Sequence, residues 1–115
     1  LGDLSFFYDR NGLWLNHEFP TNLQIVILND SGGGIFSMIP GPSNQGGLST
    51  LFTTPHERTA ELTALEFGLA YSTASSLEEI HYWESGILEI FTDMKINKKV
   101  FNQLATKAPR LKENI

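Results

Sequence analysis

The sequence of 115 residues contains no cysteine. Disulfide bonds, zinc sites built from thiolates and a cysteine nucleophile are therefore excluded. Basic residues are also few, because 8 Lys and Arg stand against 13 Asp and Glu, and the formal net charge is -5. Nucleic acids and anionic membranes attract proteins with clustered basic side chains, so we expect neither as a partner.

Long apolar segments are missing as well. No apolar run approaches the roughly 20 residues that a membrane-spanning helix needs, and no segment has the pattern of a signal peptide. With 41% hydrophobic and 18% charged residues, the composition is that of a globular protein, which we expect in the cytoplasm. The chain opens Leu-Gly-Asp without a methionine or a polar lead-in, which favours a piece of a larger protein.

Apolar periodicity and the positions of glycines predict alternating helices and strands. Strands are expected at 23–28, 69–73 and 86–92, helices at 4–15, 57–67, about 77–84 and about 95–112, and a loop at 41–55. Gly68 is expected to end the second of these helices, and Phe6, Phe7 and Trp14 are expected in the core. The alternation predicts an α/β fold with a parallel sheet and helices on its faces, a three-layer α/β/α arrangement.

Two segments place acidic or amide side chains beside glycines. Gly2-Asp3-Leu4-Ser5 opens the first helix, and Asn29-Asp30-Ser31-Gly32-Gly33-Gly34 follows the first strand. Ligands of parallel sheets bind beyond the carboxyl ends of the strands, where loops lead into helices. Asp3 and Asp30 offer carboxylate oxygens and Gly32 offers a carbonyl oxygen, which are the hard ligands that magnesium prefers.

The same segments suit a phosphate group. The amides of Leu4 and Ser5 are expected at a helix N-terminus, and the glycines at 32–34 allow the backbone to approach a ligand closely. The carboxylates of Asp3 and Asp30 would repel a pyrophosphate, so a divalent cation is needed between the carboxylates and the pyrophosphate. Taken separately, each segment also fits an ordinary structural role, an N-cap at Asp3 and a turn after the strand.

The spacing of Gly2-Asp3 and Asn29-Asp30 resembles the Gly-Asp-Gly and Asn-Asn motif of thiamine diphosphate enzymes. Within that superfamily, Gly-Asp-Leu-Ser-Phe at 2–6, Asn-Asp-Ser-Gly-Gly-Gly-Ile-Phe-Ser at 29–37 and Thr-Pro-His at 54–56 resemble the synthases of the menaquinone pathway. Leu4 replaces the glycine of the general motif, as is usual in these synthases. Asp30 stands where an asparagine is more common, which keeps an oxygen ligand but adds negative charge.

The resemblance implies a set of site residues. Mg²⁺ would be bound by the side chains of Asp3 and Asp30 and the carbonyl of Gly32. The cofactor site would comprise Gly2, Asp3, Leu4, Ser5, Asn29, Asp30, Gly32, Gly33, Gly34, Ile35 and Phe36. No catalytic residue is expected in this chain, because the glutamate that activates the cofactor in this family lies in a separate N-terminal domain. His56, which precedes a helix, is expected to have a structural role.

The same resemblance implies an activity for the whole protein. Members of the family use thiamine diphosphate and Mg²⁺ to decarboxylate 2-oxoglutarate and to add the product to isochorismate. Residues 1–115 would form the C-terminal part of the pyrophosphate-binding domain. This part would depend on the remaining N-terminal domains of the enzyme, in a homo-oligomer, and would be inactive alone.

Two alternatives stay open at this point. One is another thiamine diphosphate carboligase or decarboxylase, similar to acetolactate synthase, which a panel of substrates would distinguish. The other is a non-catalytic α/β module that binds a divalent ion at the acidic turn. That module would bind the metal whether or not thiamine diphosphate is present.

Overall fold

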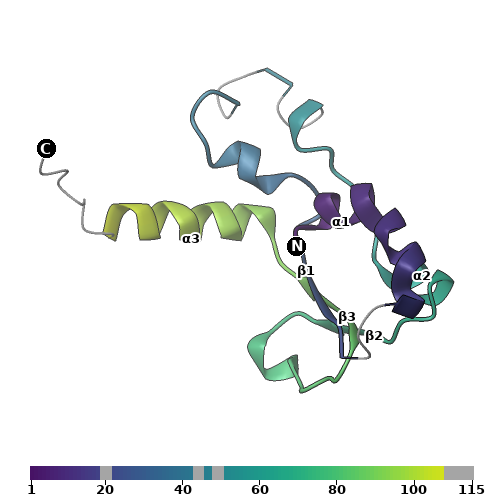
Figure 1. Ribbon diagram of the computed structural model, residues 1–115. Coiled ribbons are helices and arrows are strands. Elements are labelled where there is room, and N and C mark those ends of the chain that lie inside the picture. Colours follow the sequence, from purple (N-terminus) through teal and green to yellow (C-terminus); the bar gives the residue numbers. More distant parts are fainter. Residues whose placement is uncertain (19–21, 43–45, 48–50, 108–115) are drawn as a thin grey trace, which may run out of the picture.

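The computed structural model describes residues 1–18, 22–42, 46–47 and 51–107, and within these ranges the chain forms a parallel α/β fold (Figure 1). The strands are β1 (Gln24–Asn29), β2 (Tyr71–Ala74) and β3 (Gly86–Phe91). The helices are α1 (Asp3–Asp9), α2 (Glu61–Glu66) and α3 (Met94–Lys107), with 3-10 helices η1 (Arg10–Glu18), η2 (Gly34–Ser37) and η5 (Leu77–Glu79). The predicted α/β class is confirmed.

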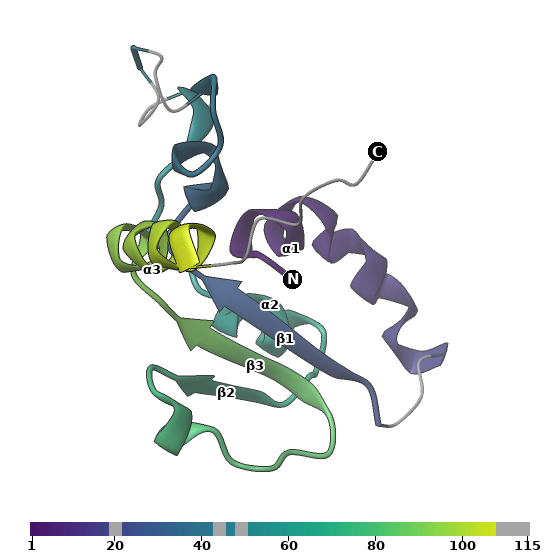
Figure 2. The same cartoon turned by 90° about the vertical axis from the view of Figure 1, so that its left-hand side faces the viewer.

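The sheet has the order β1-β3-β2, and β3 pairs in parallel with both neighbours. Asn29 at the end of β1 is opposite Phe91 at the end of β3. Because parallel strands end at the same edge of a sheet, the segments that follow β1 and β3 leave from one place. Figure 2 shows this edge, with α3 beyond the arrowheads of β1 and β3.

The core lies against one face of the sheet. Side chains alternate between the two faces of a strand, so Ile27 of β1 and Ile87 of β3, both fully buried, mark one face. Phe6 and Leu13, from α1 and η1, join a single cluster with these isoleucines. Ala60, just before α2, and Ala64 within α2 belong to the same cluster.

The opposite face of the sheet is less completely covered. Leu88 and Ala74 are buried there, but Leu28 of β1 keeps 53% of its surface exposed. The helices of the core cluster therefore form one layer on the sheet within the described part of the chain. Of the described helices, none is long and apolar enough to cross a membrane.

The first two helices differ in length from the predictions. The predicted helix at 4–15 is α-helical only from Asp3 to Asp9 and continues as a 3-10 helix. The predicted helix at 57–67 begins only at Glu61. The backbone just before it is held elsewhere, because the Arg58 carbonyl and the Ala60 N–H bond to side chains of β1 and β3. Gly68 ends α2 at φ 66°, as predicted.

Two predictions about local structure are wrong. The helix expected at 77–84 is only the short turn η5. The carbonyl of Trp83 instead accepts a hydrogen bond from the Gln24 side chain, which ties this segment to the start of β1. Trp14, expected in the core, is 68% exposed, and its ring lies perpendicular to that of Phe67, with centroids 5.6 Å apart. The strand expected at 86–92 and the helix expected near 95 are present, and residues past 107 lie outside the described ranges.

Candidate cofactor site

A cavity of about 650 Å³ opens at the edge where β1 and β3 end. It is lined by every residue predicted for the cofactor site except Asn29, namely Gly2, Asp3, Leu4, Ser5, Asp30, Gly32, Gly33, Gly34, Ile35 and Phe36. Sequence reasoning missed its other lining residues, Tyr8, Leu28, Thr92 and Asn97. A signal for Thr92 and Asn97 was available, because both follow β3 at the same edge as the turn after β1.

The start of α1 is fixed beside β1. Gly2 forms an isolated parallel bridge with Leu28, and the Leu28 N–H donates to the Leu1 carbonyl at 2.8 Å. Gly2 is the N-cap of α1 and Asp3 is the first residue of the helix. The N-cap role considered for Asp3 is therefore wrong, and its carboxylate has other partners.

Asp3 joins the start of α1 to the turn that follows β1. It is 2% exposed, and its Oδ2 accepts the Gly32 N–H at 2.9 Å. Its Oδ1 accepts the Leu4 N–H at 2.7 Å. The Leu4 amide, predicted to face a phosphate, thus donates to Asp3 in this structure, while Ser5 still lines the cavity. The contact between Asp3 and Gly32 brings the two predicted segments together.

Asn29 lies behind the cavity and shapes the turn. Its side-chain amide donates to Glu89 Oε1 at 2.7 Å and to the Arg58 carbonyl at 3.0 Å. Its Oδ1 accepts the N–H of Ser31, which has a positive φ of 64°. These bonds hold the backbone in a conformation that non-glycine residues rarely adopt, and the next acidic residue, Asp30, faces the cavity.

The glycines of the turn leave no room for side chains. A Cβ on Gly32 would lie 2.4 Å from the Thr53 carbonyl oxygen, and Gly32 has a φ of 148°. A Cβ on Gly34 would meet the carboxylate of Asp30 at 2.3 Å. The backbone of this turn therefore forms part of the cavity wall directly, as a site for a closely held ligand requires.

The electrostatics of the cavity favour a cation. Burial raises the pKa of Asp30, and the nearby negative charge of Asp3 raises it further, while a hydrogen bond from Asn97 lowers it. Arg10, the basic residue closest to Asp3 in sequence, points its guanidinium at the Thr63 hydroxyl instead. A carboxylate whose pKa is raised beside a second carboxylate fits a site for a divalent cation, which removes the repulsion.

The protein side chains do not form a complete metal cage. Among the described residues, no group of three or more His, Cys, Asp or Glu could hold a metal ion. Mg²⁺ commonly takes one or two carboxylates from a protein and its remaining ligands from water and substrate phosphates. The donor set around Asp3 and Asp30 fits that kind of site.

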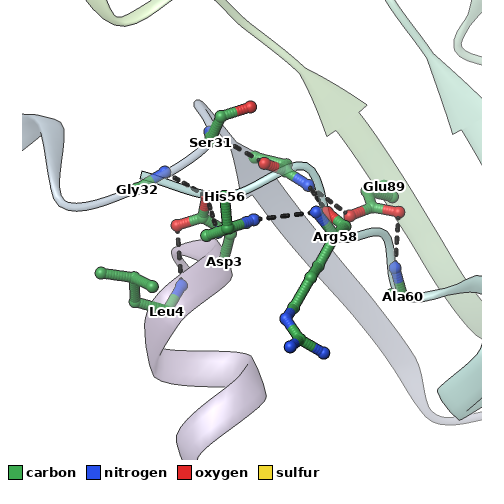
Figure 3. Close-up of polar contacts among 9 residues, drawn as sticks. Asp3, Leu4, Ser31, Gly32, His56, Arg58, Ala60 and Glu89 are labelled. Carbon is green, nitrogen blue, oxygen red and sulfur yellow. Dashed lines mark hydrogen bonds and ion pairs between the residues drawn. The ribbon is translucent and has the colours of Figure 1, made fainter. Parts of the chain in front are cut away.

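His56 is the residue next to Asp3 that the sequence analysis did not place there. Its Nε2 lies 3.1 Å from Asp3 Oδ2 (Figure 3). The sequence offered one signal for His56, because the Thr-Pro-His segment at 54–56 belongs to the family resemblance. That segment lies far from Asp3 in sequence, so the resemblance did not bring the two side chains together.

Known proteins resemble this chain over most of its length. No family profile matches it. The chain is 45% identical over 108 residues to a 2-succinyl-5-enolpyruvyl-6-hydroxy-3-cyclohexene-1-carboxylate synthase of Christiangramia forsetii, an alignment that covers 86% of this chain and 18% of the relative. Synthases of the same name from Cytophaga hutchinsonii and Desulfotalea psychrophila are each 42% identical to it, over 89% and 81% of this chain.

The chain belongs to this synthase family. It spans about a fifth of the length of these relatives, 18% to 20%. The family confirms the resemblance seen in the Gly-Asp-Leu-Ser and Asn-Asp-Ser-Gly-Gly-Gly segments. The roles of the individual residues in those segments stay predictions.

Proposed function

We propose that this chain forms the pyrophosphate- and magnesium-binding part of a thiamine diphosphate-dependent synthase of the menaquinone pathway. The observation that carries the proposal is the cavity at the ends of β1 and β3. Segments separated by more than twenty residues, around Asp3 and Asp30, converge on it. A purely structural cap and turn would not require both segments to line one cavity, with the buried carboxylate of Asp3 and the half-buried carboxylate of Asp30.

Each part of the cavity suits one part of the ligand. The carboxylates of Asp3 and Asp30 and the carbonyl of Gly32 would hold Mg²⁺. The backbone at 32–34 would lie against the pyrophosphate, and Ile35 and Phe36 would supply apolar contact. The Phe36 ring packs beside that of Phe52, with ring centroids 6.1 Å apart. When bound, thiamine diphosphate supplies the electron sink for decarboxylation, so the residues of this chain bind and orient.

The activity proposed for the whole protein is the one that the resemblance to the menaquinone-pathway synthases implies. The enzyme would decarboxylate 2-oxoglutarate and add the product to isochorismate. Catalysis would need the N-terminal domains of the same protein in a homo-oligomer, because no cofactor-activating residue is assigned to this chain. Residues 1–115 alone are expected to be inactive.

The proposal is tested by calorimetry on the full-length protein. Thiamine diphosphate is titrated with Mg²⁺ and again with a chelator, for the wild type and for Asp3→Asn. The asparagine keeps one oxygen that can accept a backbone N–H, so the turn retains part of its support. We expect cofactor binding that requires Mg²⁺ and that is lost in Asp3→Asn.

Asp9→Asn is the matched control, because it makes the same change of charge on α1, at an exposed position that does not line the cavity. This variant should bind like the wild type. If the protein binds Mg²⁺ equally well with and without thiamine diphosphate, the proposal is wrong and the chain is a module that binds a divalent ion. No binding by a folded wild type would leave the two segments as structural elements only.

A further inference from the structure

His56 contacts Asp3 but does not line the cofactor cavity. The two side chains are 10% and 3% exposed, and His56 Nε2 lies 3.1 Å from Asp3 Oδ2 (Figure 3). His56 is not among the residues that line the 650 Å³ cavity, whereas Asp3 is. It lines a separate cavity of about 290 Å³, which shares Leu4 and Tyr8 with the main cavity. His56 therefore meets the main cavity at Asp3, the lining residue that its side chain faces.

The imidazole ring is held in place on several sides. The Arg58 N–H donates to Nδ1 at 3.0 Å. The His56 backbone N–H donates to the Ser31 carbonyl at 3.2 Å, which ties the residue to the same turn as Gly32. The Phe7 ring packs edge-on against the imidazole, with centroids 5.4 Å apart and an interplanar angle of 89°. A ring with this support cannot turn away from Asp3 without losing these contacts.

The hydrogen bond from the Arg58 N–H indicates which nitrogen carries the hydrogen in the neutral imidazole. Because Nδ1 accepts a hydrogen bond, the neutral imidazole carries its hydrogen on Nε2, the nitrogen that faces Asp3. Nε2 is buried, and no well-aligned hydrogen bond satisfies it among the described residues. Asp3 Oδ2 thus accepts a hydrogen bond from the Gly32 N–H, and His56 Nε2 faces the same oxygen at 3.1 Å without the alignment of a hydrogen bond.

We propose that His56 is a positioning residue for Asp3, which holds the carboxylate where it can bind the cation of the cofactor site. A buried donor that forms no hydrogen bond elsewhere in the described part of the chain restricts how the carboxylate turns. Ligands in metal sites are generally oriented by such outer hydrogen-bond partners, and loss of one typically weakens metal binding by about tenfold to a hundredfold. This inference rests on the proposed function, because it requires Asp3 to be a ligand.

Two variants distinguish the effect of losing the N–H that faces Asp3 from the effect of losing the packing of the imidazole ring. His56→Gln can place an amide N–H near the position of Nε2, and His56→Asn can place an acceptor only near Nδ1, for the Arg58 N–H. Mg²⁺ is titrated into the full-length protein with saturating thiamine diphosphate, by calorimetry. We expect His56→Asn to weaken Mg²⁺ binding about tenfold and His56→Gln to stay within about threefold of the wild type.

A second measurement needs only the wild type, so it does not depend on whether a variant folds. Nitrogen NMR with labelled histidine should show the hydrogen of His56 on Nε2, and a hydrogen on Nδ1 alone would overturn the inference. Wild-type affinity in His56→Asn, or equal weakening in both variants, would also overturn it while leaving the proposed function intact. A folded wild type that binds no Mg²⁺ would overturn both.

Discussion

The amide of Asn29 donates a hydrogen bond of 2.7 Å to Glu89, and so joins the end of β1 to a fully buried carboxyl group in the middle of β3. Glu89 also accepts the Ala60 N–H at 2.9 Å and the Tyr71 hydroxyl at 2.6 Å. One side chain therefore fixes the turn of the candidate site, the start of α2 and the neighbouring strand β2.

Glu89→Gln should destabilise the protein. The amide nitrogen of glutamine cannot accept a hydrogen bond, so either the Asn29 amide or the Ala60 N–H faces another donor. A buried polar group without a partner costs about 1 to 3 kcal/mol, and urea unfolding of the full-length protein measures that loss. Glu66→Gln, at an exposed position of α2, is the control and should leave the unfolding midpoint unchanged. An unchanged midpoint in Glu89→Gln would show that the buried carboxyl group is dispensable.

Tyr71→Phe should reduce stability at neutral pH but not in strong alkali. The pKa of Tyr71 is raised by burial first and by its hydrogen bond to Glu89 second. An unfolded tyrosine ionises near pH 10, so above that pH the unfolded state loses a proton that the folded state keeps, and the wild type loses this stabilisation. The variant should therefore be about 1 to 2 kcal/mol less stable at pH 8, with a smaller difference above pH 10.

Unfolding of the two proteins is compared at a series of pH values from 7 to 11. Other tyrosines and lysines also titrate in alkali, and comparing wild type with Tyr71→Phe subtracts their common effect. A difference in stability that stays constant across the series would contradict the assignment of the raised pKa to this contact.

Asp30→Asn should stabilise the metal-free protein and weaken its binding of Mg²⁺. Burial and the charge of Asp3 both raise the pKa of Asp30, so its ionised form is disfavoured in the folded state. An asparagine removes that charge and keeps an oxygen. Thermal unfolding of the full-length protein in chelator should show a higher midpoint, and calorimetry should show weaker Mg²⁺ binding. A lower midpoint in chelator would mean that the charge of Asp30 makes contacts that stabilise the metal-free protein.

Gly34→Ala should disturb the candidate site without removing any polar group. The added Cβ would lie 2.3 Å from Asp30 Oδ2 and 2.9 Å from Met94 Cγ, so the carboxylate has to move. Overpacking of this kind costs about 1 to 3 kcal/mol, and Mg²⁺ binding should weaken with it. Gly12→Ala is the control, because a Cβ there meets nothing within 4 Å. Normal Mg²⁺ affinity in Gly34→Ala would show that the position of Asp30 does not matter for the cation.

Much of the fold follows from local chemistry. The β-branched run of β1 and the apolar run after Gly86 predict strands, because such residues fit a buried parallel sheet wherever they occur. Gly68 ends α2 because a positive φ is accessible to glycine at low cost. The glycines and acidic residues of the candidate site were likewise visible in the sequence, since a ligand-binding turn requires those residue types.

Contacts between distant segments decided the rest. The helix expected at 57–67 begins late because Asn29 and Glu89 hold the backbone before it, and the segment at 77–84 is tied to Gln24 instead of coiling. His56 reaches Asp3 only through the folding of the chain around α1. Helix and strand preferences depend on neighbouring residues, whereas these hydrogen bonds join groups that the tertiary fold brings together. The energies of these hydrogen bonds are large enough to override weak local preferences.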